Sequence, residues 1–190
     1  MNDVSITAGV VAISLSPRPR ILLVLERGDS IPQRDGSVFQ KPAAWGFPKG
    51  SSKGDETPME TAIRELSEET GVVLLPSDLD DDLVFSEDKL SRRPGSSVHR
   101  RVIYLVVFKD SPQLGRPIDP KIQEVRWVPL NGVPGFGRDS VGEATLSPSH
   151  AIAINDLMLR AVDRKKLNWN LVMESLLPIE AKGDEDRKRN

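Results

Sequence analysis

The segment from Val98 to Phe108 constrains the fold of this chain more than any other part of the sequence. From Val102 to Phe108 every residue is apolar or aromatic, in the order V-I-Y-L-V-V-F. A strand with one solvated face alternates apolar and polar residues, so a run without alternation indicates a strand that is buried on both faces of its sheet. The sequence therefore predicts a sheet with one layer packed above it and another below it.

Further strands and helices are predicted on both sides of this segment. The apolar runs Ala8 to Leu15 and Ile21 to Leu25 flank a turn with two prolines, which is typical of a hairpin. The polar segment Asp29 to Ala44 contains Pro and Gly and predicts a loop that overhangs the functional site. Other extended segments are expected at Val72 to Leu75, Leu83 to Phe85 and Lys121 to Pro129, with helices from Ser147-Pro148 onward and from Leu167 to Leu177. The pattern gives the fold class as mixed α/β.

Length and composition bound the class of protein. The 190 residues fit one domain, expected over residues 4–178, followed by a charged tail over 179–190. The 26 basic and 28 acidic residues give a net charge of −2, which excludes a protein that coats nucleic acid through an overall positive charge. The absence of cysteine excludes disulfide scaffolds, thiol nucleophiles and zinc sites with Cys ligands.

The N-terminal residues predict neither a signal peptide nor a membrane span. They have no basic region, and Ser and Thr interrupt their apolar run. A cytoplasmic location is therefore the expectation, and a secreted protein that has lost its leader is the alternative.

A helix with well-marked ends is predicted from Pro58 to Thr70. Thr57 is a candidate N-cap, and Glu60 three residues later completes a capping box. Pro58 suits the first helical position because its missing N–H would have no partner there. Gly71 can adopt the left-handed conformation that ends helices.

Three glutamates share one side of this helix. At about 100° per residue, Glu65, Glu68 and Glu69 gather beside the apolar stripe that faces the core. Like charges three and four residues apart repel each other. A divalent cation would satisfy all three, because carboxylate oxygens are the ligands that Mg²⁺ and Mn²⁺ prefer. The alternative is an ordinary solvated acidic face.

The residues around these glutamates resemble the Nudix box, G-x5-E-x7-R-E-U-x-E-E-x-G-U, in which U is aliphatic. All nine specified positions are matched, by Gly50, Glu56, Arg64, Glu65, Leu66, Glu68, Glu69, Gly71 and Val72. At ordinary residue frequencies, a chance match in such a chain has a probability on the order of 10⁻⁷. The order of strands and helices also resembles the Nudix fold, an α/β/α sandwich with a mixed sheet between helices.

This resemblance implies hydrolysis of a diphosphate linkage by water, with Mg²⁺ or Mn²⁺ as the cofactor. Carried over to this sequence, Glu65 and Glu69 are metal ligands and Glu68 is a ligand or the base, so all three count as catalytic. The backbone carbonyl of Lys49 is expected to join the metal ligands. Structural roles are expected for Gly50, Glu56, Arg64 and Gly71.

Basic residues outside the box predict where the substrate binds. The segment from Trp45 to Gly50, W-G-F-P-K-G, resembles the entry to the box in hydrolases of diphosphoinositol polyphosphates and diadenosine polyphosphates and in mRNA decapping enzymes. The triplet His99-Arg100-Arg101 before an apolar strand with Tyr104 resembles the corresponding part of diphosphoinositol polyphosphate hydrolases. The predicted substrate-binding residues are Arg18, Arg20, Arg27, Lys41, Lys49, His99, Arg100 and Arg101.

These features rank the candidate substrates. A diphosphoinositol polyphosphate or related polyphosphate comes first and a dinucleoside polyphosphate second, because the chain has few aromatic residues to stack on a base; Phe39, Trp45 and Phe136 are the candidates. Capped RNA, the one nucleic acid considered, comes third, because it would require an extended basic track. No membrane partner is expected, and the oligomeric state is left open.

A rival from another class is a Nudix-like module that binds a phosphorylated ligand or a protein without catalysis. Modules of that kind tend to lose their metal-binding glutamates. The presence of Glu65, Glu68 and Glu69 argues against it.

Overall fold

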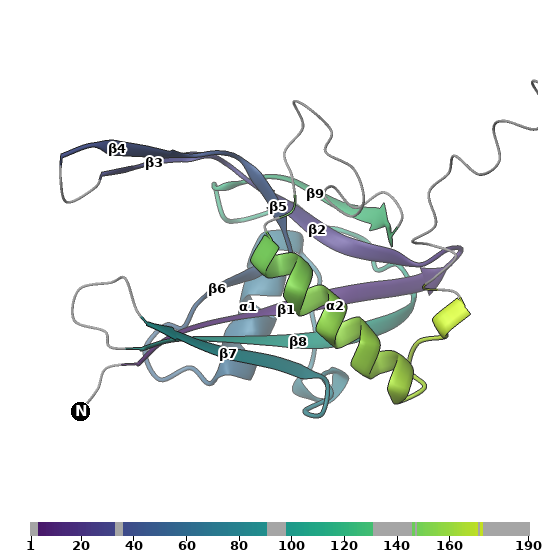
Figure 1. Cartoon of the computed structure of the whole chain (residues 1–190). Helices are drawn as coiled ribbons and strands as arrows, with labels where there is room; N and C mark the ends of the chain where they lie inside the picture. The colour runs from purple at the N-terminus through teal and green to yellow at the C-terminus, as the bar shows by residue number, and fades with distance from the viewer. Residues whose placement is uncertain are drawn as a thin grey trace, which may run out of the picture.

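A twisted mixed sheet forms the centre of the molecule (Figure 1), in a computed structural model that describes residues 4–32, 36–90, 98–130, 146, 148–170 and 172. Its two long strands, β1 (Val4–Ser16) and β8 (Val98–Asp110), lie side by side and parallel, from the pair Val4 and Val98 to the pair Ser16 and Asp110. The other strands join antiparallel: β2 (Arg20–Glu26), β5 (Ala44–Gly46), β6 (Lys49–Ser51), β7 (Val84–Leu90) and β9 (Ile122–Pro129). The main path runs β5-β2-β1-β8-β7, with β6 on β1 and β9 on β2.

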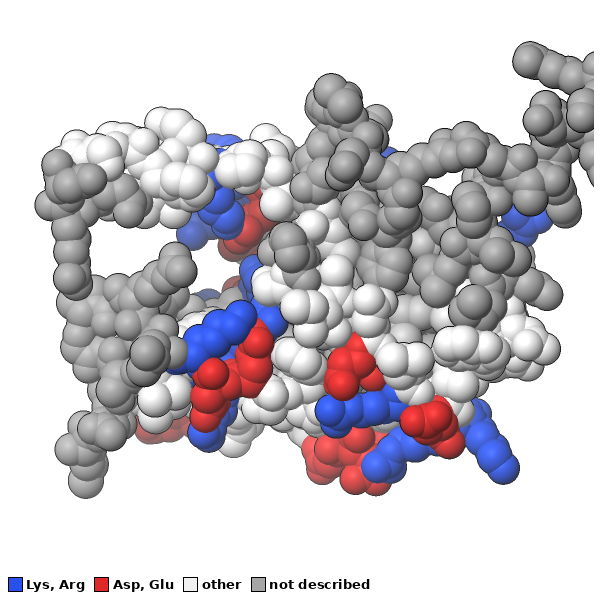
Figure 2. Space-filling view, viewed as in Figure 1, with Lys and Arg blue, Asp and Glu red and all other residues white. Residues whose placement is uncertain are grey.

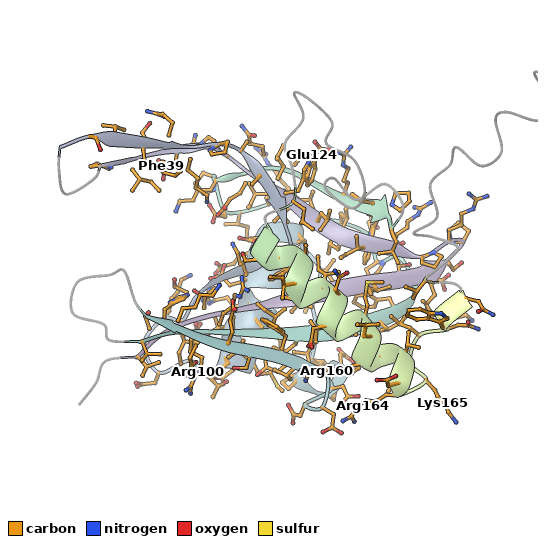
Figure 3. All side chains as sticks on the ribbon, viewed as in Figure 1. Phe39, Arg100, Glu124, Arg160, Arg164 and Lys165 are labelled. Atoms are coloured by element: carbon orange, nitrogen blue, oxygen red, sulfur yellow. The ribbon has the colours of Figure 1, made fainter. Side chains whose placement is uncertain are left out.

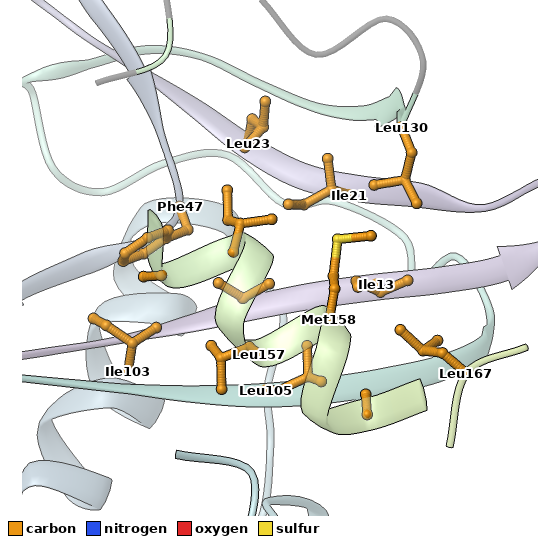
Figure 4. Close-up of a cluster of buried hydrophobic side chains, with 14 of the residues drawn as sticks. Ile13, Ile21, Leu23, Phe47, Ile103, Leu105, Leu130, Leu157, Met158 and Leu167 are labelled. Carbon is orange, nitrogen blue, oxygen red and sulfur yellow. The ribbon is translucent and has the colours of Figure 1, made fainter. Parts of the chain in front are cut away.

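Two helices cover opposite faces of this sheet. Alternate residues of β1 point to opposite sides, so Val10 joins the cluster under α1 (Pro58–Thr70) while Val11 and Ile13 join the cluster under α2 (Pro148–Asp163). Figure 4 shows the second cluster, in which Leu157 and Met158 of α2 meet Ile13, Ile21, Leu23, Ile103 and Leu105 of the sheet. The prediction of layers on both sides of the Val98 to Phe108 strand, and with it the α/β/α sandwich, is confirmed.

The helix predicted from Pro58 to Thr70 is confirmed at both ends. Thr57 Oγ1 accepts the N–H of Glu60 at 3.2 Å, and the Glu60 carboxylate accepts the N–H of Thr57 at 2.9 Å. Gly71 has φ of 73°, and its N–H donates to the Ser67 carbonyl at 2.9 Å. The ends of α1 are therefore fixed by local chemistry, which sets the direction in which its glutamates point.

The segment from Asp29 to Ala44 differs from its prediction as a loop. It forms an antiparallel ribbon of β3 (Asp29–Pro32) and β4 (Val38–Lys41), which pairs Ile31 with Phe39. The polar composition did not indicate these two short strands, because their residues are mostly exposed on both faces. The ribbon, called the arm below, projects from the body of the molecule (Figure 1).

Smaller differences concern the segments after α1. Val72 to Leu75 is extended but pairs with no described strand, although Val72 and Leu74 are buried. The strand expected at Leu83 to Phe85 runs as β7 to Leu90, and a short 3₁₀ helix, η1 (Pro76–Asp78), precedes it. Most of the helix expected from Leu167 to Leu177, the boundary at residue 178, the tail over 179–190 and Phe136 lie outside the described residues. No described helix is long and apolar enough to cross a membrane.

Candidate functional site

Two of the three predicted glutamates are buried where α1 packs against the sheet. Glu65 and Glu69, one helical turn apart, keep only 7% and 5% of their surface exposed, whereas the Glu68 side chain keeps 33%. The alternative of a solvated acidic face therefore fails for Glu65 and Glu69. Burying a carboxylate is costly unless it gains partners, so the contacts of each side chain decide what this cluster can do.

Arg64 joins the loop before α1 to the glutamates. Its guanidinium donates to both Glu56 oxygens, at 2.7 and 2.9 Å, to Glu65 at 2.6 Å and to Glu68 at 3.1 Å. It also donates to the carbonyl of Ser51 at 3.0 Å. The bonds from Arg64 to Glu56 lower the pKa of Glu56 to about 2, with a further contribution from the N–H of Lys53 at 2.9 Å. Glu56 and Arg64 thus fix the loop and orient the carboxylates.

Gly50 makes room for one of these carboxylates. β6 carries Gly50 past α1 so closely that a Cβ atom at this position would overlap the carboxylate of Glu65. A glycine is therefore required if Glu65 is to point inward along β6. This contact gives a physical reason for the first residue of the box.

Glu69 lies deepest and has the weakest compensation. Burial raises the pKa of its carboxyl to about 8, against the opposing charge of Lys49 and the N–H of Lys49, which Glu69 Oε2 accepts at 3.1 Å. The neighbouring Glu65 and Asp119 raise the pKa further. A buried carboxylate with this little compensation fits a bound cation.

The backbone of Lys49 faces the buried glutamates of α1. The N–H groups of Val10 and Ser52 donate across to Pro48 and Ile6, so Lys49 occupies a position of the ladder that makes no hydrogen bonds to β1. Its N–H turns to Glu69 instead. In an extended strand the N–H and carbonyl of one residue point to the same side. The Lys49 carbonyl is therefore directed toward the glutamates.

These groups fit a hard divalent cation. The donors are carboxylate oxygens of Glu65, Glu68 and Glu69 with a backbone carbonyl, which is the set that Mg²⁺ and Mn²⁺ prefer. Within the described ranges, however, no three acidic or His side chains already converge as a finished metal cluster. Arg64 Nη1 contacts one oxygen of Glu65 and one of Glu68, so it holds these two carboxylates beside each other.

A pocket of about 140 Å³ opens beside Glu69. Its polar lining includes two residues outside the predicted substrate-binding set, Glu26 on β2 and His150 at the start of α2, as well as Lys41 and Lys49. Val24, Ala44, Trp45, Gly46, Phe47 and Ile122 complete the lining. Figure 2 shows this side of the molecule hollowed between the arm and the strands below, with side chains of both charges around the hollow.

His150 is enclosed in this pocket. Its ring lies 4.4 Å from the Phe47 ring, and a Cβ at Gly46 would come within 2.5 Å of its Nδ1, so Gly46 leaves the space that the imidazole fills. Nδ1 has no hydrogen-bond partner among the described residues. Burial, and then the charges of Lys49 and Arg101, lower the pKa of His150 to about 3. The side chain is therefore a neutral group in the wall of the pocket.

The burial of His150 predicts a loss of stability in mild acid. Its pKa is near 6.5 in the unfolded chain and lower in the folded one, so its contribution is full above pH 6.5 and is lost as the pH falls toward 3. The limiting slope is about 1.4 kcal/mol per pH unit. We expect denaturant unfolding of wild type between pH 6.5 and 4 to weaken more steeply than that of His150→Gln. Identical slopes would show that His150 is not held neutral.

Three of the predicted substrate-binding residues lie beside the pocket. Lys41 and Lys49 line it, and Lys41 is paired with Glu26 at 2.6 Å. Arg27 is exposed and lines a smaller adjoining pocket, which shares Glu26 and Lys41 with the first. Lys121, which was not among the predicted residues, lines the smaller pocket as well.

Arg18 and Arg20 lie elsewhere. Arg18 lies in the turn between β1 and β2, and Arg20 begins β2, whereas Gly50 pairs with Ala8 toward the other end of β1 (Figure 1). The nine residues from Ala8 to Ser16, separated by eight steps of about 3.3 Å, span about 26 Å of strand. The structure therefore does not bring Arg18 and Arg20 together with the box, because the hairpin carries them away from it.

The basic triplet does not act as one unit. Residues of a strand alternate between faces, so Arg100 points away from His99 and Arg101. Arg100 makes two bonds of 2.8 Å to Asp88, and Arg101 is buried against Glu87 and donates to the Ser149 carbonyl at 3.1 Å. His99 Nδ1 lies 2.9 Å from Ser5 Oγ. The triplet therefore presents no common phosphate-binding surface.

Known proteins share parts of this sequence and its fold. RNA pyrophosphohydrolase from Xylella fastidiosa is 43% identical over 60 residues, a match that covers 30% of this chain and 28% of that protein. The chain thus covers under a third of the length of this curated relative. In the described part of the chain, the sheet and helices resemble those of two solved proteins. A MutT/nudix family protein from Enterococcus faecalis has a TM-score of 0.63 at 21% identity, covering 93% of this chain and 68% of that one. An Ap4A hydrolase from C. elegans has a TM-score of 0.53 at 16% identity, covering 83% and 98%.

The family assignment rests on a longer match. A family model for the NUDIX domain matches residues 6–147, which include the whole box and most of the sheet. The box glutamates lie together on α1, the helix whose ends the sequence predicted. This chain belongs to the Nudix family.

Proposed function

We propose that this protein is a pyrophosphohydrolase that uses a divalent cation to hydrolyse a diphosphate linkage in a small phosphorylated substrate. One observation carries the proposal: Glu69 is buried at the wall of a pocket, with a pKa raised to about 8 by that burial. A structural role would favour an apolar residue here, because a buried carboxylate without full compensation destabilises the fold. A bound cation would compensate the charge of this buried carboxylate.

Each residue of the site has a proposed task. Glu65, Glu69 and the Lys49 carbonyl would hold the cation, with Glu68 beside them. When bound, the cation neutralises charge on the diphosphate and lowers the pKa of water. Glu68, the most exposed of the three glutamates, takes the proton of the attacking water at its carboxylate. The Lys49 side chain lies in the pocket wall, where it can bind a phosphate oxygen.

The positions of the basic residues favour a substrate with few phosphates. A diphosphoinositol polyphosphate would require many cations around one ring, but Arg18 and Arg20 are distant and Arg100 and Arg101 are engaged by acids. We therefore place a dinucleoside polyphosphate before the inositide. The pocket needs only Lys41 and Lys49 to meet a short diphosphate chain.

RNA with a 5′ diphosphate or triphosphate is the second candidate. It is favoured by the local match to RNA pyrophosphohydrolase, which covers 60 residues. It would also explain an open site beside the arm, because the RNA chain must leave the pocket. A substrate of this kind would place its first nucleotide where a dinucleoside polyphosphate places one of its nucleosides.

A substrate panel with and without Mg²⁺ tests the proposal. Diadenosine tetraphosphate, ADP-ribose, 5′-triphosphorylated RNA, a nucleoside triphosphate and a diphosphoinositol phosphate are incubated with the full chain, and products are identified by mass spectrometry. We expect turnover that requires the cation, with dinucleoside polyphosphate or RNA ahead of the inositide by at least about 10-fold in kcat/KM. Inositide turnover ahead of both would overturn the ranking, and tight binding without turnover would indicate the non-catalytic module instead.

A further inference from the structure

The arm carries apolar side chains on both of its faces. Phe39 and Val38 on β4 expose 54% and 55% of their surface, and Ile31 on β3 exposes 40%. Neighbouring residues of a strand point to opposite faces, and residues paired across two strands share a face. Ile31 and Phe39 are such a pair, so they share one face, and Val38 lies on the other.

The face with Ile31 and Phe39 is continuous with the pocket. Lys41 is two residues from Phe39 on β4, so it lies on the same face, about 7 Å along the strand. Its ammonium group reaches Glu26 at 2.6 Å and lines the pocket beside Glu69. A molecule that occupies the pocket and extends along the arm would therefore meet Phe39 next.

The arm has little support from the rest of the described chain. β3 and β4 pair with each other and with none of the described strands of the main sheet. A two-stranded ribbon is marginally stable alone. Figure 3 shows Phe39 on the arm, away from the two clusters that form the core. An exposed aromatic ring in this position needs a reason beyond the packing of its own fold.

We infer that the face formed by Ile31 and Phe39 binds the planar ring of the substrate, a nucleobase, while the diphosphate lies between Lys41 and Glu69. This inference rests on the proposed function and assigns the base-binding part of that site to the arm. Phe39 stacks on the base, and Ile31 covers the edge of the stack. Every base has a π face, so this contact selects for a base without selecting which base.

A base fits this face better than a second copy of the chain does. Stable protein interfaces bury about 800 Å² on each partner, far more than two side chains offer. On the same face, the paired residues Asp29 and Lys41 place charges at the root of the arm. A ring attached to a phosphate chain matches an aromatic platform next to a cationic group.

The test compares Phe39→Ala with Val38→Ala, two neighbours of equal exposure on opposite faces. The substrates are diadenosine tetraphosphate and inorganic tripolyphosphate, which has no ring. Loss of one stacked base corresponds to about a 5- to 150-fold change in affinity. We expect Phe39→Ala to raise KM for diadenosine tetraphosphate by this factor with little change in kcat, and to leave tripolyphosphate unchanged. Phe39→Tyr should restore KM, and Val38→Ala should change neither substrate.

The outcomes separate this inference from the proposed function. If neither substrate is hydrolysed with Mg²⁺, the inference fails, and the proposed function fails with it when the rest of the substrate panel is left intact as well. If both are hydrolysed and Phe39→Ala changes them equally, or Val38→Ala matches its effect, the inference fails and the proposed function stands. Sedimentation tests whether a second copy of the chain covers this face instead. If the protein is a dimer, and Phe39→Ala dissociates it without changing KM, the face belongs to a second copy and the inference is overturned.

Discussion

Replacing Glu69 with Gln is expected to abolish cation-dependent hydrolysis and, in the absence of metal, to stabilise the protein. Activity should fall by roughly 100-fold or more, because the cation supplies several kcal/mol of charge stabilisation and Glu69 is a proposed ligand. Gln keeps the size and shape of the side chain, so the variant should fold. A gain in stability together with a loss of activity distinguishes a functional carboxylate from a structural one.

The gain in stability follows from the raised pKa. The pKa of Glu69 is about 8 in the folded chain and near 4.5 in the unfolded chain, so the stability of wild type is full below pH 4.5 and is lost as the pH rises through 8. An uncharged amide at this position does not titrate. We therefore expect Glu69→Gln and wild type to converge near pH 4, and the variant to be more stable by about 2 to 4 kcal/mol at pH 8.

Denaturant unfolding at a series of pH values, with EDTA present, measures this difference. Glu124→Gln on β9 is the matched control, because Glu124 is exposed and pairs only with Arg126 among the described ion pairs, and it should change neither activity nor the pH dependence. Glu68→Gln should lose most activity without the gain in stability, since Glu68 is partly exposed. A Glu69→Gln protein that is less stable than wild type at pH 8 would contradict the account.

Replacing Gly50 with Ala is expected to remove activity while the protein stays folded. The added methyl group would overlap the carboxylate of Glu65, which is the far end of a flexible side chain and can turn away at small cost. A turned Glu65 no longer faces β6, so cation binding should weaken by at least about 10-fold, the scale seen when groups that orient metal ligands are removed. Stability should change by less than about 1 kcal/mol.

Gly71→Ala supplies the contrast. Gly71 has φ of 73°, and a Cβ there would lie 2.5 Å from the backbone of Gly115, which cannot turn aside. This variant should lose stability by a few kcal/mol, at least about 2, and keep its activity per folded molecule. Calorimetric titration with Mn²⁺ and thermal unfolding separate the two results. If Gly50→Ala binds Mn²⁺ as wild type does, Glu65 is not a ligand.

The parts of the fold that the sequence predicted are those that local chemistry determines. Thr57, Pro58, Glu60 and Gly71 act within a few residues of α1, so the sequence alone is enough to assign its ends. The long apolar run in β8 indicated burial on both faces of the sheet. This signal, too, is contained in one segment of the sequence. Each of these signals is readable without knowledge of the rest of the chain.

The remaining parts depend on contacts between distant segments. His150 lines the pocket because α2 begins beside Gly46 and Phe47, about one hundred residues earlier in the chain. Glu26 lies at the pocket because β2 pairs with β5. One sequence signal is informative about such contacts: Gly46 and Gly50 flank a short stretch before the box, and each glycine leaves room for a side chain from another element.

The basic triplet shows how a sequence pattern can mislead. His99, Arg100 and Arg101 are adjacent in the chain, but a strand turns neighbouring residues to opposite faces. Asp88 and Glu87 on β7 then pair with the two arginines across the strand pair. Basic residues that are adjacent in the sequence therefore need not lie on one phosphate-binding surface.

Phosphorus NMR of diadenosine tetraphosphate, incubated with wild type and with Glu69→Gln, each with Mg²⁺ and with EDTA, tests directly whether the buried glutamates form a cation-dependent site. We expect the polyphosphate resonances of the substrate to be converted to product resonances only for wild type with Mg²⁺. Equal conversion by Glu69→Gln, or conversion by wild type that is unaffected by EDTA, would contradict the assignment of Glu65, Glu68 and Glu69 to a cation-dependent site.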